Sequence, residues 1–365
     1  MYVALGILAS VVLLFLAGIA YQHFASLRDR RIHTAEGRLI NIRRGCNLYF
    51  FEAGEGQPTV VFGSGIGATH LSWRGIQDEI STLTRTVSYD RAGLGWSSPT
   101  RAQRTPGALA RELHQMLDAA GVEPPYVLVG HSFGGLVVRR FALLYPREVA
   151  GIVLVDPMRP EEWPPLNPAR QAQLDLGKRL IRYTIPVARC GLARIVVKVL
   201  LGRCGSSTDR AASQAVDPPH RLLRRIRTEA RKLPCKVWPA LAAHWSRAGF
   251  YDGLRNHLVS IPSAVREMHD AEPIRGIPVA VLTPGNADPL TRDQLHRIGD
   301  SIRQTLALNS GHWIHLDEPE LVINAIRTAI GAPVAPAAGY NHPAITFLAA
   351  SPLPDGDIIV SARRF

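Results

Sequence analysis

The chain has 365 residues, of which 46% are hydrophobic and 20% are charged. It can therefore bury one large core with an inserted subdomain, and its composition excludes a disordered protein. The net charge of +12 is typical of a protein with an anionic partner. Because no nucleic-acid-binding motif accompanies it, we expect this partner to be a membrane surface and not a nucleic acid.

The N-terminal residues 1–25 are predicted to form a membrane anchor. From Tyr2 to Ala20 there is no charged side chain, and this length is close to what spans a bilayer. A cleaved signal peptide is the alternative, but no basic residue precedes the segment. We expect a single-pass protein of the cell membrane with a basic linker over 26–37. Arg28 and Arg30 follow the segment and would place the rest in the cytoplasm, although the side stays open.

Residues 38–158 alternate between strand and helix patterns, which predicts a mostly parallel sheet with ligands at the carboxyl ends of its strands. The expected strands are a hairpin of 39–44 with 47–52, followed by 59–62, 85–89, 126–129 and 149–155. The expected helices are 71–83, 105–120 and the segment from 133 to 145.

The alternation stops over residues 159–275, where Pro-punctuated helical patterns predict a helical cap. Residues 178–236 hold fifteen Lys or Arg against three acidic residues. Within them, 192–201 could lie on an anionic membrane, or its basic residues could form a solvated face. Trp163, Trp238 and Trp245 are candidates to line an apolar substrate pocket.

The core resumes over 276–332, with a strand at 278–283, a helix near 291–304 and a strand at 305–308. Residues 333–365 form an Ala/Pro-rich extension with one candidate strand at 357–361. The four cysteines are widely spaced, so neither a zinc site nor a dense disulfide framework is expected. Cys190 and Cys204 could pair in an oxidising compartment, but separate thiols are the expectation.

The run Gly130-His131-Ser132-Phe133-Gly134-Gly135 lies between an apolar strand pattern and a helix pattern. Glycines on both sides of Ser132 permit a sharp turn that projects its hydroxyl, as in a nucleophile elbow. The Phe133 N–H then lies at the start of a helix, where an anion is stabilised. A second oxyanion donor is expected in the glycine-rich loop 63–67, and we assign it to the Ile66 N–H. That loop has no Lys and no dinucleotide fingerprint, which argues against phosphate binding.

A serine nucleophile requires a base and an orienting carboxylate. His312 follows Gly311 in a loop that can reach the elbow, and His315 is its rival. Asp288, in a loop at a strand end, is the preferred acid. Asp156, which ends the strand after the nucleophile helix, is the alternative. Asp90 precedes the nucleophile in a glycine-rich bend, where hydrogen bonding to the loop is its expected role.

With these groups in the order Ser, Asp, His, residues 38–331 resemble the α/β-hydrolase fold superfamily. The segments Tyr89–Ser97 and Gly311–Leu316 are similar to motifs of bacterial membrane-tethered hydrolases. The resemblance implies an α/β-hydrolase fold with an inserted helical cap, Ser132 as nucleophile, His312 as base, Asp288 as acid, and the Ile66 and Phe133 N–H groups as oxyanion donors. The usual His-Gly of the oxyanion loop is replaced by Ser64-Gly65.

The expected activity is hydrolysis of carboxylic esters with an apolar part, without cofactor or metal. A serine nucleophile argues against dehalogenase and epoxide-hydrolase chemistry, for which relatives use Asp. Peptidase activity on amino-terminal Pro peptides, thioesterase activity and acyl transfer are alternatives at the same triad. A catalytically inactive binding module of this fold is the alternative from another class.

Overall fold

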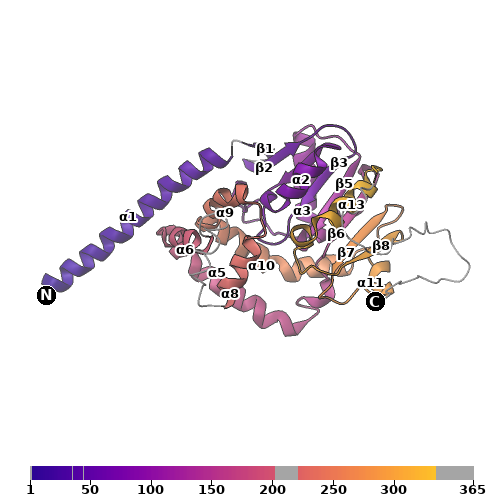
Figure 1. Cartoon of the computed structure of the whole chain (residues 1–365). Helices are drawn as coiled ribbons and strands as arrows, with labels where there is room; N and C mark the ends of the chain where they lie inside the picture. The colour runs from indigo at the N-terminus through magenta and orange to yellow at the C-terminus, as the bar shows by residue number, and fades with distance from the viewer. Residues whose placement is uncertain (1, 35, 44, 202–220, 334–365) are drawn as a thin grey trace, which may run out of the picture. The chain divides into compact units, whose positions relative to one another are not determined.

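The computed structural model describes residues 2–34, 36–43, 45–201 and 221–333 (Figure 1). Cys204, residues 334–365 and the candidate strand at 357–361 lie outside the described residues. Met1–Val334 forms one compact unit, so the helices between the two halves of the sheet do not form a separate unit.

The described strands form one sheet in the order β1-β2-β4-β3-β5-β6-β7-β8. Their bounds are β1 (Arg38–Arg43), β2 (Cys46–Ala53), β3 (Thr59–Gly63), β4 (Thr86–Tyr89), β5 (Tyr126–His131), β6 (Val149–Val155), β7 (Val279–Pro284) and β8 (Ile302–Ala307). The pairs β1–β2 and β2–β4 are antiparallel and the other pairs are parallel, which confirms the mostly parallel sheet.

The last strand starts earlier than expected. The helix expected near 291–304 is the short α11 (Arg292–His296), and β8 begins at Ile302. Residues 302–307 pair in parallel with all six residues of β7, from Val279 to Pro284. Pairing with β7 therefore overrides the helical pattern of this segment.

Helices cover both faces of the sheet (Figure 1). Their bounds are α2 (Arg74–Ile80), α3 (Pro106–Ala119), α4 (Phe133–Leu144), α12 (Ile314–Asp317) and α13 (Pro319–Ala329). Apolar side chains of α3 and α4, such as Leu113 and Phe141, share one buried cluster with the sheet. Ile76 of α2 and Val322 of α13 share another. This two-sided burial explains why β3, β5 and β6 are nearly continuous apolar runs.

Between β6 and β7 the described residues form helices and no strand, and we call residues 157–278 the helical insertion. Its α-helices are α5 (Gln171–Arg189), α6 (Leu192–Leu201), α8 (Arg221–Ala230), α9 (Trp238–Trp245) and α10 (Ala248–His269). Leu174 of α5 and Ile261 of α10 share a buried cluster with Phe133 at the start of α4. The insertion therefore packs directly on the segment that follows Ser132.

The first helix, α1 (Tyr2–His33), is long and apolar enough to cross a membrane. Most of its apolar side chains are exposed, and it extends away from the sheet (Figure 1). Its second half touches the helical insertion: the buried Gln22 side chain donates to the carbonyl of Ser246 at 2.8 Å. The Arg30 guanidinium donates to the carbonyl of Trp96 at 2.8 Å, so the helix is also tied to the loop after β4.

Candidate active site

Ser132 lies in the turn that joins β5 to α4, with φ 53° and ψ −120°. Such a backbone costs a residue with a Cβ atom about 1–3 kcal/mol and persists only where its surroundings enforce it. Here the Ser132 N–H donates to the Val155 carbonyl at 3.1 Å. The Ser132 carbonyl accepts from the N–H groups of Gly135 and Met158, both at 3.0 Å. These bonds hold the half-buried serine at the carboxyl edge of the sheet, as expected for an elbow.

Gly134 is required because residues 63–67, which we call the oxyanion loop after the donor expected there, pass against the start of α4. A Cβ on Gly134 would approach the Gly63 carbonyl oxygen too closely and would lie 2.7 Å from the Ser64 oxygen. Both neighbours are backbone atoms, which cannot move without displacing the loop. The loop and the elbow are therefore packed as one unit.

We expect Gly134→Ala to lower the free energy of unfolding by about 1–3 kcal/mol because it overpacks this contact. Gly249→Ala is the matched control, since it lies in α10 with nothing within 4 Å of an added Cβ. That change should be stabilising by up to about 1 kcal/mol, from helix propensity. Urea unfolding curves of both variants test the difference, and equal midpoints would contradict it.

His312 is paired with Asp156. Its Nδ1 atom is 2.6 Å from Asp156 Oδ2, and the two side chains are 44% and 18% exposed. A carboxylate accepts the hydrogen bond, so Nδ1 carries the proton and Nε2, on the opposite edge of the ring, can accept one. Asp156 directly follows β6, whose neighbour β5 leads to Ser132. The three groups thus come from the ends of strands on one sheet edge.

Asp288 is not at this position. It lies in the exposed loop after β7, where its backbone carbonyl accepts a hydrogen bond from the Arg159 guanidinium at 2.6 Å. Its carboxylate makes no ion pair with any residue that the structure describes. The structure therefore corrects the carboxylate partner of His312 from the preferred Asp288 to the alternative, Asp156. The reason is distance along the chain: Asp156 follows its strand directly, whereas Asp288 lies four residues beyond the end of β7.

Two further histidine rings lie beside His312. The ring centroids of His131 and His312 are 4.6 Å apart, and His131 Nε2 donates to the His312 carbonyl at 2.8 Å. His315 is buried and stacks on Trp73 at 4.5 Å. Burial lowers the pKa of His315 to about 3 and that of His131 well below its usual value, so both rings are neutral at pH 7. Neither is suited to act as a base, and His131 instead holds the His312 loop against the elbow.

The oxyanion loop follows β3 and touches Ser132. A Cβ on Gly65 would lie 3.3 Å from the Ser132 Cβ. The N–H groups of Ile66 and Phe133 make no hydrogen bond with any described residue. Phe133 is the first residue of α4, so its free N–H lies at the positive end of the helix dipole. Two free backbone donors on segments that meet at Ser132 fit the arrangement that stabilises an oxyanion.

Arg91 fixes the orientation of this loop. Its buried guanidinium donates to the carbonyls of Ser64 at 2.7 Å and Gly65 at 2.5 Å. In a trans peptide the C=O and N–H point in opposite directions, so holding the Gly65 carbonyl also aims the Ile66 N–H. Burial lowers the pKa of Arg91 to about 10, which still leaves it charged at pH 7. Its guanidinium carbon lies 5.4 Å from the Phe133 ring centroid.

The preceding Asp90 has the loop-bonding role expected from the sequence. Its carboxylate accepts from the backbone N–H groups of His70 at 2.9 Å and Trp96 at 3.0 Å, and from the His70 ring at 2.9 Å. Although burial opposes ionisation, the His70 charge and these hydrogen bonds leave the pKa of Asp90 below its usual value. Ser64 stands where the resemblance implies a histidine. Its hydroxyl donates to the Thr69 carbonyl at 2.9 Å and so closes the oxyanion loop.

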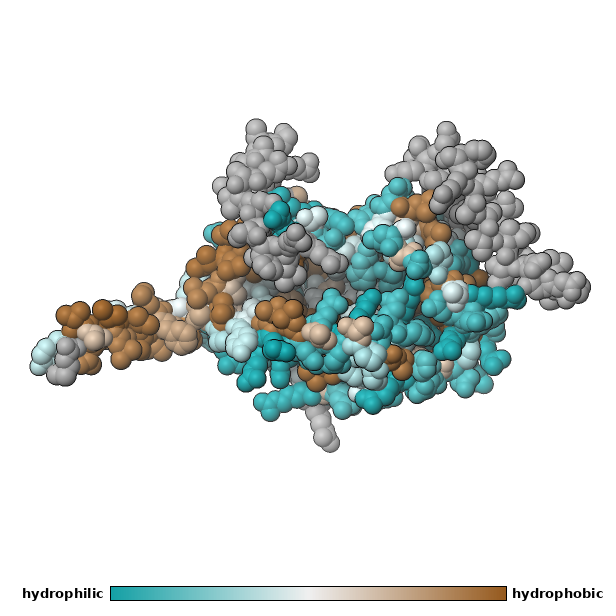
Figure 2. Space-filling view, turned by 90° about the horizontal axis from the view of Figure 1, so that it is seen from below, coloured by the Kyte–Doolittle hydropathy of each residue, from teal (hydrophilic) through white to brown (hydrophobic). Residues whose placement is uncertain are grey.

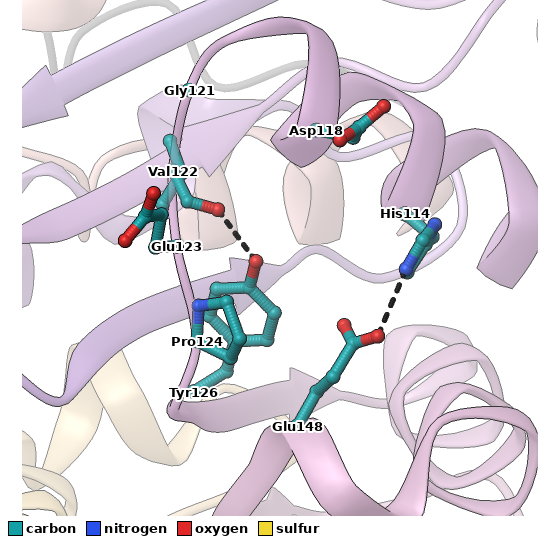
Figure 3. A pocket seen from close by; sticks show the side chains of 8 residues that line it. All are labelled: His114, Asp118, Gly121, Val122, Glu123, Pro124, Tyr126 and Glu148. Atoms are coloured by element: carbon teal, nitrogen blue, oxygen red, sulfur yellow. Dashed lines mark hydrogen bonds and ion pairs between the residues drawn. The ribbon is translucent and has the colours of Figure 1, made fainter.

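A hollow lies at the end of the sheet opposite the elbow. It has a volume of about 310 Å³ and lies beside the start of β5, between the end of α3 and the beginning of β6 (Figure 3). The Tyr126 hydroxyl donates to the Val122 carbonyl at 2.6 Å, and His114 pairs with Glu148 at 3.1 Å. Because Tyr126 begins β5 and Ser132 follows its end, this hollow is separate from the elbow.

A family model described as alpha/beta hydrolase fold matches residues 58–319. The chain belongs to the α/β-hydrolase fold family. Members of this family are hydrolytic enzymes, and the matched residues include the elbow, the oxyanion loop and His312.

Curated relatives of this α/β-hydrolase match shorter stretches. Uncharacterized protein YqjL of Bacillus subtilis is 36% identical over 104 residues, which are 28% of this chain and 41% of that protein. Putative carbamate hydrolase RutD of Cronobacter turicensis is 36% identical over 102 residues, which are 28% of this chain and 38% of that protein. The matches thus span less than half the length of these relatives.

Solved structures share the fold. Epoxide Hydrolase A from Mycobacterium thermoresistibile has a TM-score of 0.60 at 24% identity, covering 81% of this chain and 98% of that one. A thermophilic esterase from Thermogutta terrifontis has a TM-score of 0.55 at 20% identity, covering 80% and 97%. At these identities the likeness concerns the α/β-hydrolase fold alone.

The three tryptophans considered for the substrate pocket of this hydrolase lie in two places. Trp163 packs on the cluster around Phe133, next to the elbow. Trp238 and Trp245 pack in another cluster with Leu241 and side chains of α6, and the Trp238 indole donates to the Leu233 carbonyl at 3.0 Å. The structure therefore brings only Trp163 of the three into the elbow cluster.

Proposed function

We propose that this hydrolase cleaves carboxylic esters through an acyl-enzyme, with Ser132 as nucleophile, His312 as base and Asp156 as the orienting acid. The observation that carries the proposal is the strained Ser132 turn, which is held beside two free backbone donors on the sheet edge where His312 meets Asp156. Strain of this kind is retained where a side chain must be projected for a function.

The chemistry follows from the placement of these groups. His312 Nε2 takes the proton of the Ser132 hydroxyl as its oxygen attacks the ester carbonyl. The oxygen of the tetrahedral intermediate accepts from the N–H groups of Ile66 and Phe133. The protonated His312 then gives its proton to the leaving alkoxide. In the second half, His312 activates a water that releases the acyl group from Ser132.

The surroundings of the two donors favour an apolar acyl group. Ile66, Trp163 and Leu258 are partly exposed and pack on the buried cluster that contains Phe133 and Met158. Covering these side chains with an acyl chain removes apolar surface from water at about 25 cal/mol per Å². This surface, rather than the fold, is the reason to favour an ester with an apolar acyl part.

A fluorophosphonate probe, which reacts only with activated serines, tests the proposal. The wild-type chain should be labelled, and Ser132→Ala should lose the label while it keeps its circular dichroism spectrum. Ser301→Ala, at an exposed serine, is the matched control and should be labelled as the wild type is. Labelling that persists in Ser132→Ala, or is absent from the folded wild type, would exclude Ser132 as the nucleophile.

A carbamate is the second candidate substrate, because relatives named putative carbamate hydrolases are 32–39% identical over stretches of about 100 residues. A carbamate carbonyl can use the same nucleophile and oxyanion donors. Turnover of an alkyl ester against a carbamate of equal chain length, each expressed as kcat/KM, decides between the two.

We further propose that α1 tethers the enzyme to a membrane. The helix has an 18-residue window of mean hydropathy 2.7, none of it buried. Cys46 and Cys190 are free thiols, whereas Cys235 is in a disulfide. Because disulfides persist in oxidising compartments, Cys235 favours a hydrolase domain outside the cytoplasm, against the orientation that the arginines after α1 suggest.

A further inference from the structure

Two helices of the helical insertion present apolar side chains to solvent beside α1. On one face of α5 these side chains are between 38% and 70% exposed: Leu176, Leu180, Tyr183 and Val187. On one face of α6 they are between 51% and 63% exposed: Leu192, Ile195, Val196 and Val199. Figure 2 shows apolar surface along α1 and on the adjoining side of the body. We call these eight residues the α5–α6 face.

The position of this face along α1 is set by a close contact between backbones. A Cβ on Gly18 would lie 2.5 Å from the Cys190 carbonyl oxygen, and one on Gly191 would lie 3.3 Å from the Gly18 oxygen. Gly18 belongs to the uncharged segment of α1, whereas the first Lys, Arg, Asp or Glu after it is Arg28. At 1.5 Å per residue, the turn between α5 and α6 lies about 15 Å nearer the apolar end of α1 than Arg28 does.

Polar contacts also fix the position of α6 along α1. The Arg194 guanidinium of α6 donates to Gln22 Oε1 at 3.0 Å and pairs with Asp29 at 2.7 Å. The Arg194 and Asp29 side chains are 16% and 13% exposed. If the uncharged segment of α1 lies in lipid, these contacts place the start of α6 at the boundary between the acyl chains and water.

The charge next to the α5–α6 face is positive. Residues 171–201 contain six basic side chains and one acidic one. On α5, exposed Arg179 and Arg182 each precede an apolar residue of the face by one position, which places the basic stripe beside the apolar stripe. An apolar face edged by arginines is the pattern of helices that lie in the surface of an anionic bilayer.

We propose that α5 and α6 are embedded in the headgroup and acyl boundary of the bilayer that α1 crosses, with the α5–α6 face toward the acyl chains. The proposal rests on the tether proposed for α1 and is independent of the ester chemistry. Leu174, on the inner side of α5, belongs to the cluster that contains Phe133. One helix thus faces the membrane on one side and packs on the other against the cluster of Phe133, the residue after Ser132, which fits apolar substrates taken from the bilayer.

Site-specific photo-crosslinking to lipid tests the proposal without using enzyme activity. The full chain is inserted into vesicles of phosphatidylcholine and phosphatidylglycerol, with a diazirine analogue of phenylalanine in place of Ile195. The same analogue in place of Leu308 is the matched control, because both side chains are 60% exposed and Leu308 follows β8, far along the chain from α1. In place of Leu13, within α1, it reports whether the helix enters the bilayer.

We expect lipid adducts at Ile195 and Leu13 and none at Leu308, with a smaller yield at Ile195 when phosphatidylglycerol is omitted. Lipid adducts at Leu13 without any at Ile195 would overturn the proposal. An adduct between two chains at Ile195 would also overturn it and identify a second copy of the chain as the partner. Loss of adducts at Leu13 would reject the tether itself. None of these results depends on whether Ser132 is the nucleophile.

Discussion

Asp156→Asn is expected to lower kcat for a water-soluble ester by about 10⁴-fold, the loss seen when the orienting carboxylate of a serine triad is amidated. The amide can donate to His312 Nδ1, which favours the tautomer with its proton on Nε2 and removes the acceptor for the serine proton. At 2.6 Å from Nδ1, Asp156 is the carboxylate that His312 contacts. The measurement is steady-state kcat and KM, with the rate of fluorophosphonate labelling as a second readout.

Asp288→Asn is the matched control, because it makes the same change in a carboxylate that lies in the next strand-end loop. That side chain is exposed and unpaired among the described residues, so kcat should stay within about twofold of wild type. If Asp288→Asn lost the activity and Asp156→Asn kept it, the acid proposed here would be wrong. Similar melting temperatures for the two variants would show that the comparison concerns the site and not the fold.

The fold was predictable because its pattern is repeated along the chain. Each expected strand of the first half is present, and Ser132 lies in the expected turn, since glycines and a flanking strand and helix define an elbow locally. The acid was harder to predict. Asp156 and Asp288 both follow a strand, and sequence order does not give the length or direction of the loop that carries each carboxylate. Only packing shows that the loop of His312 approaches β6.

Two residues that hold the site were not identified as such from the sequence. The sequence shows His131 only as a member of the elbow run, and its hydrogen bond to the His312 carbonyl joins residues 181 positions apart. Arg91 belongs to the segment Tyr89–Ser97, but its contacts to Ser64 and Gly65 depend on the approach of two loops. The signal in the sequence is the position of Arg91 between strand β4 and a glycine-rich bend. An arginine buried at such a place needs acceptors, and the carbonyls of a neighbouring loop can supply them.

Arg91→Gln is expected to lower kcat by about 10²–10³-fold with little change in KM, which is the loss found when one oxyanion donor is removed. Arg91 touches no substrate and is a positioning residue: without it, the Gly65 carbonyl is free to rotate and the Ile66 N–H loses its direction. A donor that acts on the tetrahedral intermediate and not on the bound ester affects kcat and leaves substrate binding unchanged.

Arg139→Gln separates this role from a general cost of removing a buried arginine. Arg139 is 5% exposed, burial lowers its pKa to about 10 as for Arg91, and it also donates to a backbone carbonyl, that of Arg297 at 3.1 Å. Both variants should lose stability, because each removes hydrogen bonds made by a buried guanidinium. Only Arg91→Gln should lose kcat, since only its carbonyls belong to the loop that carries an oxyanion donor. An equal fall in kcat for both variants would mean that Arg91 acts through stability alone.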